Sequence, residues 1–477
     1  MWFATIGLAI VAAVASGFAP APAILLFAVV VVVAASVLRP GFALGAVVFS
    51  ALIMSGLQTA ITLPTQASLL TRVFIAVFAL STMLRLRRGM RVSAHLTPFI
   101  IWAGILAVST MVAVSDRILS LQGFWTYLCG PVAFLAILYS DLCESTLKKL
   151  SLAIAGLMAL QLPVVLYQNL FVATKVDEIG GTFGKVGGTS LQAIIMGFTW
   201  TVAIALLAGK RRVWLVPIAA AVVTVLLVSE AKAGFLFCAI GTVAAGLAIG
   251  VLTRRFATVS IKYTAIAAGA VAALFAGYAY AGSVLKGGER GAINLLASMS
   301  TSGAVVRYLF SHGPQGQAGR LEGVRLALMQ GRSALADALI GRGPGLLSSS
   351  TLLGGTSAFL AATGATFEWA TSLTRSILET GILGTLTYAV VVAAAVWTVS
   401  DSWKPRVGEL GTAVVAACVG LAAVYLVAGV YASAWHSDAV AVTFWCVMGI
   451  AAKWGQVRRA AAMASSPVEE TSATAAV

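Results

Sequence analysis

The stretch GFLFCAIGTVAAGLAIGVL at residues 234–252 decides the fold class of this chain. It contains no charged side chain, and the nearest basic residues stand just outside it, at Lys232, Arg254 and Arg255. A helix of about 20 apolar residues is long enough to cross the hydrocarbon core of a lipid bilayer. The stretch is therefore predicted to be a membrane-spanning helix.

The same alternation of long apolar runs and short charged clusters continues through the 477 residues. Hydrophobic residues make up 60% of the chain and charged residues only 10%, whereas a soluble protein carries roughly 25% charged residues. A net charge of +15 would suggest nucleic-acid binding in a soluble protein, but no segment resembles a nucleic-acid-binding module. We therefore predict a polytopic, all-α integral membrane protein.

About fourteen apolar runs, or twelve at the fewest, are predicted to span the membrane. They lie at 2–18, 21–38, 42–62, 68–84, 96–114, 122–140, 149–172, 187–208, 213–229, 234–252, 261–282, 373–399, 411–431 and 436–454. They divide the chain into membrane helices at 1–282, a large loop with short helices at 283–372, membrane helices at 373–460 and a tail at 461–477. The tail is small and polar, and we predict that it is disordered.

Basic residues gather on alternate connections between these runs. The clusters are Arg39; Arg85, Arg87, Arg88 and Arg91; Lys148 and Lys149; Lys210, Arg211 and Arg212; Arg254, Arg255 and Lys262; Lys404 and Arg406; and Lys453, Arg458 and Arg459. Cytoplasmic loops of membrane proteins are enriched in Lys and Arg. With about fourteen spans, every cluster and both termini are predicted to be cytoplasmic, and the large loop lies on the outer face.

The large loop carries an amphipathic pattern over 321–339, with apolar residues at helical spacing and arginines between them. We expect a helix that lies on the outer surface of the membrane. The run Gly341-Arg342-Gly343-Pro344-Gly345 then ends the helix. Two interpretations of this run stay open: a plain turn, which we favour, or a loop whose backbone N–H groups approach an anion.

The five cysteines stand singly in or near apolar segments, with no CxxC pair. We interpret them as small buried apolar residues and expect neither a disulfide nor a metal site. They are Cys129, Cys143, Cys238, Cys418 and Cys446.

Four stretches, in the expected order, resemble the O-antigen ligase and polymerase superfamily. These are membrane glycosyltransferases that use polyprenyl-diphosphate-linked sugars. The stretches are Gly181-Thr182-Phe183-Gly184; Ser229 to Gly234; Gly319-Arg320 with Gly341 to Gly345; and Arg375 to Gly384. The resemblance covers roughly residues 170–400. It implies a multi-pass protein of the bacterial cytoplasmic membrane.

The chain also departs from the pattern of this superfamily. Ligases carry a His about nine residues before the Glu that corresponds to Glu379, and Ala370 and Thr371 stand there instead. Gly187-Gly188 replaces an Asn pair, and Lys232 replaces an Arg. These departures weigh more against a ligase than against a polymerase.

The chemistry implied by the resemblance is transfer or polymerisation of oligosaccharide units from a polyprenyl diphosphate on the outer side of the membrane. Positioned arginines would stabilise the leaving diphosphate without a metal or a cofactor. The expected partners are the lipid-linked donor, a sugar or lipid-linked glycan acceptor and membrane lipids, and not nucleic acid. The candidate catalytic residues are Glu368, Glu379, Arg375 and Arg320, and the candidate substrate-binding residues are Lys185, Lys232, Arg342, Arg325 and Arg72.

Alternatives stay open for single residues and for the whole protein. Glu379 and Arg375 are one helical turn apart, so a purely structural ion pair is as good an interpretation. His436, beside Asp438, ranks low as a base, and His312 ranks lower. The competing functions are ligase-type transfer of a finished glycan, a lipid or anion transporter or flippase, and a peptidoglycan-type glycosyltransferase, for which Asp337 is the loop candidate.

Overall fold

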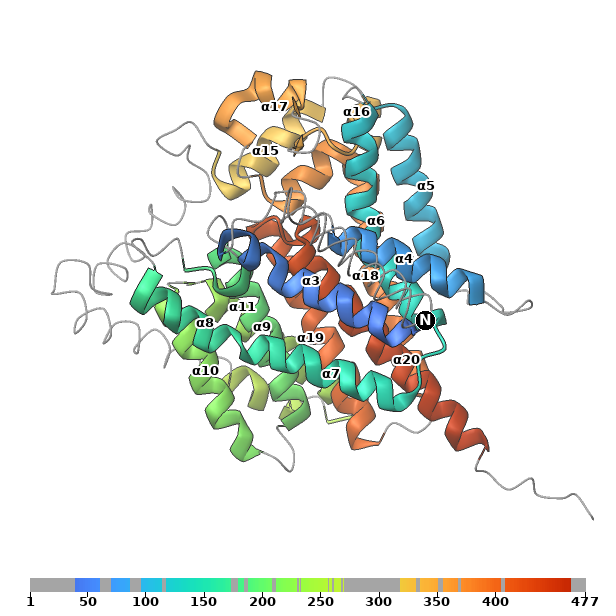
Figure 1. The fold of residues 1–477 in the computed structure, drawn as a ribbon, viewed down its shortest axis with the longest axis vertical. Coiled ribbons are helices and arrows are strands. Elements are labelled where there is room, and N and C mark those ends of the chain that lie inside the picture. The colour runs from blue at the N-terminus through green and yellow to red at the C-terminus, as the bar shows by residue number, and fades with distance from the viewer. Residues whose placement is uncertain are drawn as a thin grey trace, which may run out of the picture.

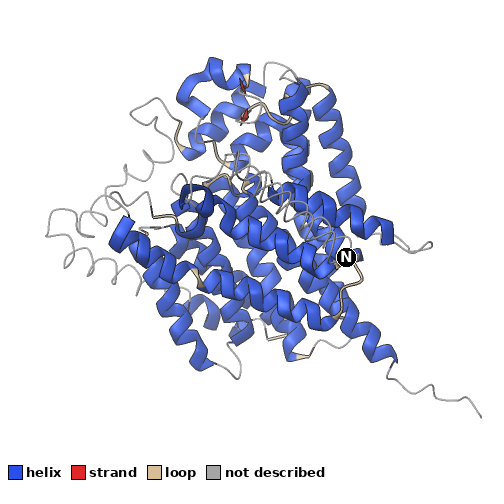
Figure 2. Cartoon of the chain, viewed as in Figure 1, coloured by secondary structure: helices blue, strands red, loops and turns tan. Residues whose placement is uncertain are grey.

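The structure, a computed structural model, is built almost wholly of helices (Figure 2). It describes residues 39–60, 70–85, 96–113, 117–172, 179–183, 188–207, 212–229, 231, 233–255, 257–259, 261–266, 269, 318–331, 335–350, 355–367, 370–404 and 408–464. The predicted runs at 2–18 and 21–38, most of the run at 261–282, and residues 465–477 of the predicted tail lie outside these residues. The first four residues of that tail, 461–464, are not disordered, because they continue the last helix of the chain. The prediction of a helical protein is confirmed for the part of the chain that is described, apart from one short pair of strands.

Seven helical segments of the described residues are long and apolar enough to cross a membrane. They are α6 (Arg117–Tyr139); α7 (Glu144–Ala159), which continues through α8 (Gln161–Tyr167) and η3 (Gln168–Val172); α9 (Gly188–Leu207); α11 (Ala233–Leu252); α18 (Ser372–Ser402); α19 (Glu409–Tyr431); and α20 (Thr443–Ala464), preceded by η9 (Asp438–Val442). Further helices at predicted spans are α3 (Pro40–Ala60), α4 (Leu70–Arg85), α5 (Thr97–Met111) and α10 (Leu215–Val228). The chain thus has the helices of a membrane protein, and the count of about fourteen spans stays a prediction.

Short elements complete the described chain. The turns are η5 (Gly181–Phe183), η6 (Arg212–Trp214), η7 (Gly364–Phe367) and η8 (Ala434–His436). In the large loop lie α15 (Arg320–Gly331), α16 (Leu335–Ile340) and α17 (Ala358–Thr363), with a small antiparallel pair of strands, β1 (Ser349–Ser350) and β2 (Gly355–Thr356). The helix predicted over 321–339 is therefore found as two helices, α15 and α16.

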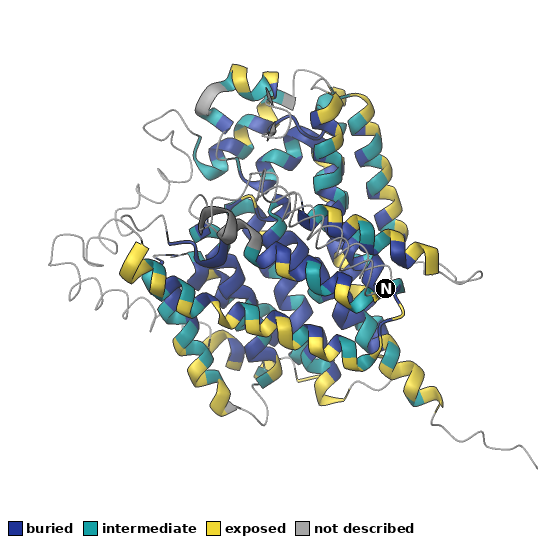
Figure 3. Ribbon diagram, viewed as in Figure 1, coloured by how far each residue is buried: buried dark blue, intermediate teal, exposed yellow. Residues whose placement is uncertain are grey.

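The centre of the bundle is packed through small residues and aromatic rings. A Cβ on Gly241 of α11 would lie 1.8 Å from Thr201 Oγ1 of α9, so these helices approach as closely as glycine allows. Tyr388, Tyr425 and Trp445 fill the space between α18, α19 and α20, and the two tyrosine hydroxyls are 2.7 Å apart. Exposed apolar side chains lie on the outside of the bundle, as lipid-facing positions require (Figure 3).

Helices α15 to α17 form a cap at one end of the bundle, beside the ends of α5 and α6 (Figure 1). The cap is attached through α18, which breaks at Gly381, where φ is +69° and ψ is −175°. The break frees backbone carbonyls that an apolar environment cannot satisfy. Arg342 N donates to Leu378 O and Gly343 N donates to Glu379 O, both at 2.9 Å. Ser109 Oγ donates to Glu379 O at 2.7 Å.

The run 341–345 is therefore a turn that completes a broken helix. The N–H groups of Arg342 and Gly343, which could have met an anion, are used by α18. Gly341, Gly343 and Gly345 have φ of +73°, +99° and +87°, a region that side chains disfavour. The turn also fits against α5 and α6 with no room for a Cβ, because a Cβ on Gly345 would lie 2.2 Å from Leu119 O.

The cysteines are all free thiols, and four of them are buried. Cys143, between α6 and α7, is exposed, contrary to the expectation that all five are buried. Its position explains the difference, because residue 143 precedes α7 at the end of the bundle and lies in no helix.

We predict that Gly343→Ala and Gly345→Ala lower the free energy of unfolding by on the order of 2–5 kcal/mol, from positive-φ strain and overpacking. Gly104→Ala is the matched control, since nothing lies within 4 Å of a Cβ there. In an open helical position alanine stabilises by roughly 0.5–1 kcal/mol relative to glycine. Thermal unfolding of the purified protein in detergent measures all three. Equal effects at Gly104 and Gly343 would contradict the assigned turn.

Candidate functional site

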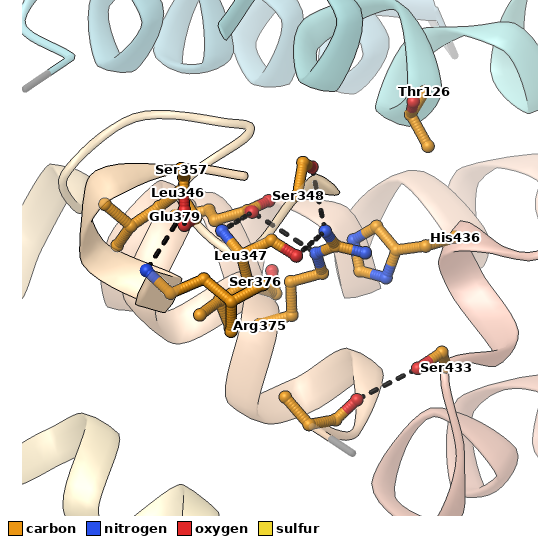
Figure 4. Close-up of polar contacts among 12 residues, drawn as sticks. Thr126, Leu346, Leu347, Ser348, Ser357, Arg375, Ser376, Glu379, Ser433 and His436 are labelled. Atoms are coloured by element: carbon orange, nitrogen blue, oxygen red, sulfur yellow. Dashed lines mark hydrogen bonds and ion pairs between the residues drawn. The ribbon is translucent and has the colours of Figure 1, made fainter. Parts of the chain in front are cut away.

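A polar cavity of about 230 Å³ lies where the starts of α4, α6 and α18 meet the connection between α19 and α20. Figure 4 shows part of its lining, including Arg375, Glu379 and His436. It is lined by Arg72, Gln122, Gly123, Thr126, Tyr127, Leu347, Ser348, Arg375, Glu379 and His436. Two guanidinium groups, a carboxylate and an imidazole thus share one enclosure within an otherwise apolar helix bundle.

Arg375 and Glu379 come from the first half of α18, one turn apart. Arg375 Nε lies 3.2 Å from Glu379 Oε1, and Leu347 N donates to the same oxygen at 3.0 Å. Arg375 Nη2 donates to Ser348 Oγ at 2.9 Å and to Leu347 O (Figure 4). The Glu379 side chain is 1% exposed. The chain that follows the 341–345 turn therefore holds both side chains in place.

Arg72 and Asp438 form a second pair on the other side of the cavity. Arg72 Nε lies 3.3 Å from both carboxylate oxygens of Asp438, and Arg72 Nη1 donates to Thr126 Oγ1 at 2.8 Å. Side-chain exposures of 17% and 18% show that this pair is shielded from bulk solvent. Ion pairs in such surroundings persist because each charge would be costly alone.

Arg72 and Arg375 each have guanidinium N–H groups that make no hydrogen bond to the described residues. Within the described residues, Nη1 of Arg375 and Nη2 of Arg72 make no hydrogen bond. A guanidinium group stays charged when partly buried, and its planar N–H groups match the oxygens of phosphate. The cavity can therefore bind an oxyanion through the two free ends, while the paired ends hold the arginines still.

His436 lies on the cavity wall, 9% exposed. Its Nδ1 is 3.3 Å from Ser372 Oγ, which accepts a hydrogen bond from Trp435 N at 2.9 Å. The ring packs edge to face on Tyr127, with centroids 4.5 Å apart. Among the described residues, neither the buried His436 Nε2 atom nor the buried Tyr127 hydroxyl has a hydrogen-bond partner. Burial, and then the charges of Arg375 and Arg72, hold the pKa of His436 well below its usual value.

The structure brings three of the nine candidate residues together: Glu379, Arg375 and Arg72 line the cavity. Three others lie on or beside the cap helices. Arg320 stacks over Tyr431 at 3.9 Å from the ring centroid, Arg325 pairs with Glu322, and Arg342 pairs with Asp337 at 2.9 Å. Glu368, Lys185 and Lys232 lie outside the described residues, as does His312.

Sequence reasoning ranked His436 low as a base and did not single out Ser372, Thr126 or Tyr127, which lie in or beside the cavity. No spacing signal could have found these residues, because Ser372 and His436 are 64 positions apart in the chain. The described residues contain no group of three or more His, Cys, Asp or Glu side chains that could hold a metal ion.

Comparison with known proteins adds no further assignment. No protein-family model matches the chain, and no curated protein matches it significantly.

The Glu379 carboxylate is predicted to be a major contributor to stability. Glu379→Ala leaves the Leu347 N–H and the Nε–H of Arg375 without an acceptor and removes the counter-charge of Arg375, so the free energy of unfolding should fall by about 3–5 kcal/mol. Glu144→Ala is the matched control, because Glu144 also accepts from several partners, Lys148 at 3.0 Å and Arg458 at 3.1 Å, but is 31% exposed. Its loss should cost about 1 kcal/mol or less. Thermal unfolding of both variants in detergent provides the comparison, and a smaller loss for Glu379→Ala would refute the assigned burial.

Proposed function

We propose that this protein is a membrane glycosyltransferase that transfers or polymerises polyprenyl-diphosphate-linked oligosaccharide units. The proposal rests mainly on the polar cavity. There, Arg72 and Arg375 come from separate helices and present unused N–H groups beside a buried imidazole. In such a reaction the bond from the sugar to the diphosphate breaks, and negative charge develops on the diphosphate. Preorganised donors at that position stabilise the transition state.

The size of the cavity supports binding of a head group. Sites for whole small molecules are typically roughly 300–1,000 Å³, and this cavity, of about 230 Å³, is smaller. A diphosphate with the first sugar is the portion we place inside, with the polyprenyl chain among the apolar helix surfaces. Arg342, Arg325 and Arg320 then belong to the cap and would contact more distant parts of the glycan.

The arrangement of the helix ends supports an outward-facing site. The starts of α18 and α20 contribute Arg375 and Asp438 to the site, whereas Arg458, near the end of α20, pairs with Glu144 at the start of α7. Under the positive-inside rule the Arg458 end is cytoplasmic and the cavity lies at the outer face. We therefore propose about fourteen spans in a bacterial cytoplasmic membrane, with both termini inside and the cap on the outer face.

One observation favours the transporter alternative. Broken helices near a binding site are common in transporters, and α18 is broken at Gly381. The 341–345 turn satisfies the freed carbonyls, however, so this break is sealed by protein. A ligase that transfers a finished glycan would use the same diphosphate chemistry and is the closer alternative.

Mass spectrometry of polyprenyl-linked glycans in a deletion strain separates these functions. For a polymerase, the strain should accumulate single lipid-linked repeat units, and wild-type protein should restore long chains. Arg375→Ala and Arg72→Ala should cut long-chain product by about 100-fold or more, the effect of removing one transition-state donor. Arg459→Ala, which removes an exposed arginine at the opposite end, should restore product fully.

Other outcomes are equally clear. Long chains that remain on the lipid carrier would show a ligase. An unchanged lipid-linked pool in the deletion strain would exclude a glycosyltransferase and move the transporter to first place.

Cys143 tests the proposed orientation. Hydrogen bonds from Ser145 and Thr146 lower the pKa of this exposed thiol to about 6. It is therefore mostly thiolate above that pH, the reactive form. A membrane-impermeant maleimide should label it in inside-out vesicles but not in intact cells, at a rate nearly constant from pH 7 to pH 8. Cys143→Ser supplies the background, and labelling in intact cells would reverse the orientation.

A further inference from the structure

The Nε2 atom of His436 is the feature of the cavity from which this inference starts. A buried polar nitrogen without a hydrogen bond costs roughly 1–3 kcal/mol. This Nε2 atom is buried and has no such partner in the part of the chain that the structure describes. The side chain comes from η8, a short turn between two long helices, and lines the same enclosure as both arginines. An atom kept in that state is poised for a partner that arrives with the substrate.

The imidazole is also fixed in orientation. Ser372 Oγ holds Nδ1, and the edge-to-face contact with Tyr127 fixes the plane of the ring. When Nδ1–H donates to Ser372 Oγ, the lone pair is left on Nε2, on the other side of the ring. Orientation of one ring nitrogen by a neighbour is how histidine bases are usually prepared.

The charges around His436 keep it neutral. Arg375 and Glu379 line the same cavity from α18, Arg72 from α4 and Tyr127 from α6. Asp438 of η9 is paired with Arg72. Burial, and then the two cations, lower the pKa of His436, so the ring is unprotonated at neutral pH and can accept a proton. The Oε1 atom of Glu379 already receives hydrogen bonds from Leu347 N and Arg375 Nε.

We propose that His436 is the general base of the transfer reaction, an inference that rests on the proposed function. Its Nε2 takes the proton as the O–H bond of the acceptor sugar breaks. The freed oxygen bonds to the anomeric carbon of the donor. The bond from that carbon to the diphosphate oxygen breaks, and its electron pair leaves on the diphosphate held by Arg72 and Arg375. Ser372 is a positioning residue, because it acts through the imidazole.

Membrane vesicles that contain the protein and its native lipid-linked donor test this role. The initial rate of glycan elongation or transfer is measured from pH 5 to pH 8.5 for wild type, His436→Gln, His436→Ala and Ser372→Ala. Loss of the base should lower the rate by about 100-fold to 10,000-fold in both His436 variants. The wild-type rate should fall as the pH drops below the lowered pKa of His436, and the residual rate of His436→Gln should lack that fall.

Two readouts separate catalysis from folding. Added imidazole should raise the rate of His436→Ala at least tenfold, because it can occupy the emptied space, but not that of His436→Gln, where the amide fills it. Ser372→Ala should lose activity while keeping the acid fall, since the base is still present though less well oriented. The amount of each variant protein in the membrane is compared with the amount of the Arg459→Ala protein, as a check on folding.

The outcomes also separate this inference from the proposed function. His436→Gln with a rate within about threefold of wild type, while Arg375→Ala is inactive, would refute the base and leave the glycosyltransferase standing. Failure of imidazole rescue together with an unchanged acid fall in His436→Gln would do the same. Wild-type vesicles that transfer no glycan would overturn both.

Discussion

When a membrane helix breaks, the backbone groups that it frees need new hydrogen-bond partners. This requirement determines the structure at the end of the protein that holds the polar cavity. Helix α18 breaks at Gly381, and the carbonyls of Leu378 and Glu379 are satisfied by the turn at 341–345 and by Ser109. The large loop is thereby tied to a membrane helix by backbone hydrogen bonds. Its glycines are required because a Cβ would collide with α5, α6 or α18.

That tie sets the geometry of the cavity. The residues that follow the turn, Leu347 and Ser348, bind Glu379 and Arg375 directly. The same short segment therefore satisfies the freed carbonyls of α18 and positions two side chains of the cavity. Arg72 and Asp438 are placed independently, by α4 and by the start of α20. The two arginines come from helices that are far apart in the sequence, and both reach the same cavity. Rigid placement of this kind is what transition-state stabilisation requires.

The sequence predicts the helices well because long apolar runs are governed by local composition, as 234–252 and α11 show. It also identified Arg375 and Glu379. It could not predict that Asp438 pairs with Arg72, 366 residues away, nor that 341–345 serves α18, because tertiary contacts decide both. Nor could it predict that Ser372 contacts His436, which another element supplies 64 positions further along the chain.

The four charged groups of the site cancel. Glu379 and Asp438 neutralise Arg375 and Arg72, so the protein never has to hold two bare cations in a medium of low polarity. An arriving anion is then attracted only through the unused guanidinium edges and meets two resident carboxylates. Such a site holds a dianion less tightly than two unpaired arginines would. In the glycosyltransferase that we propose, the same balance that keeps the folded protein stable would favour release of the spent carrier, and with it repeated turnover.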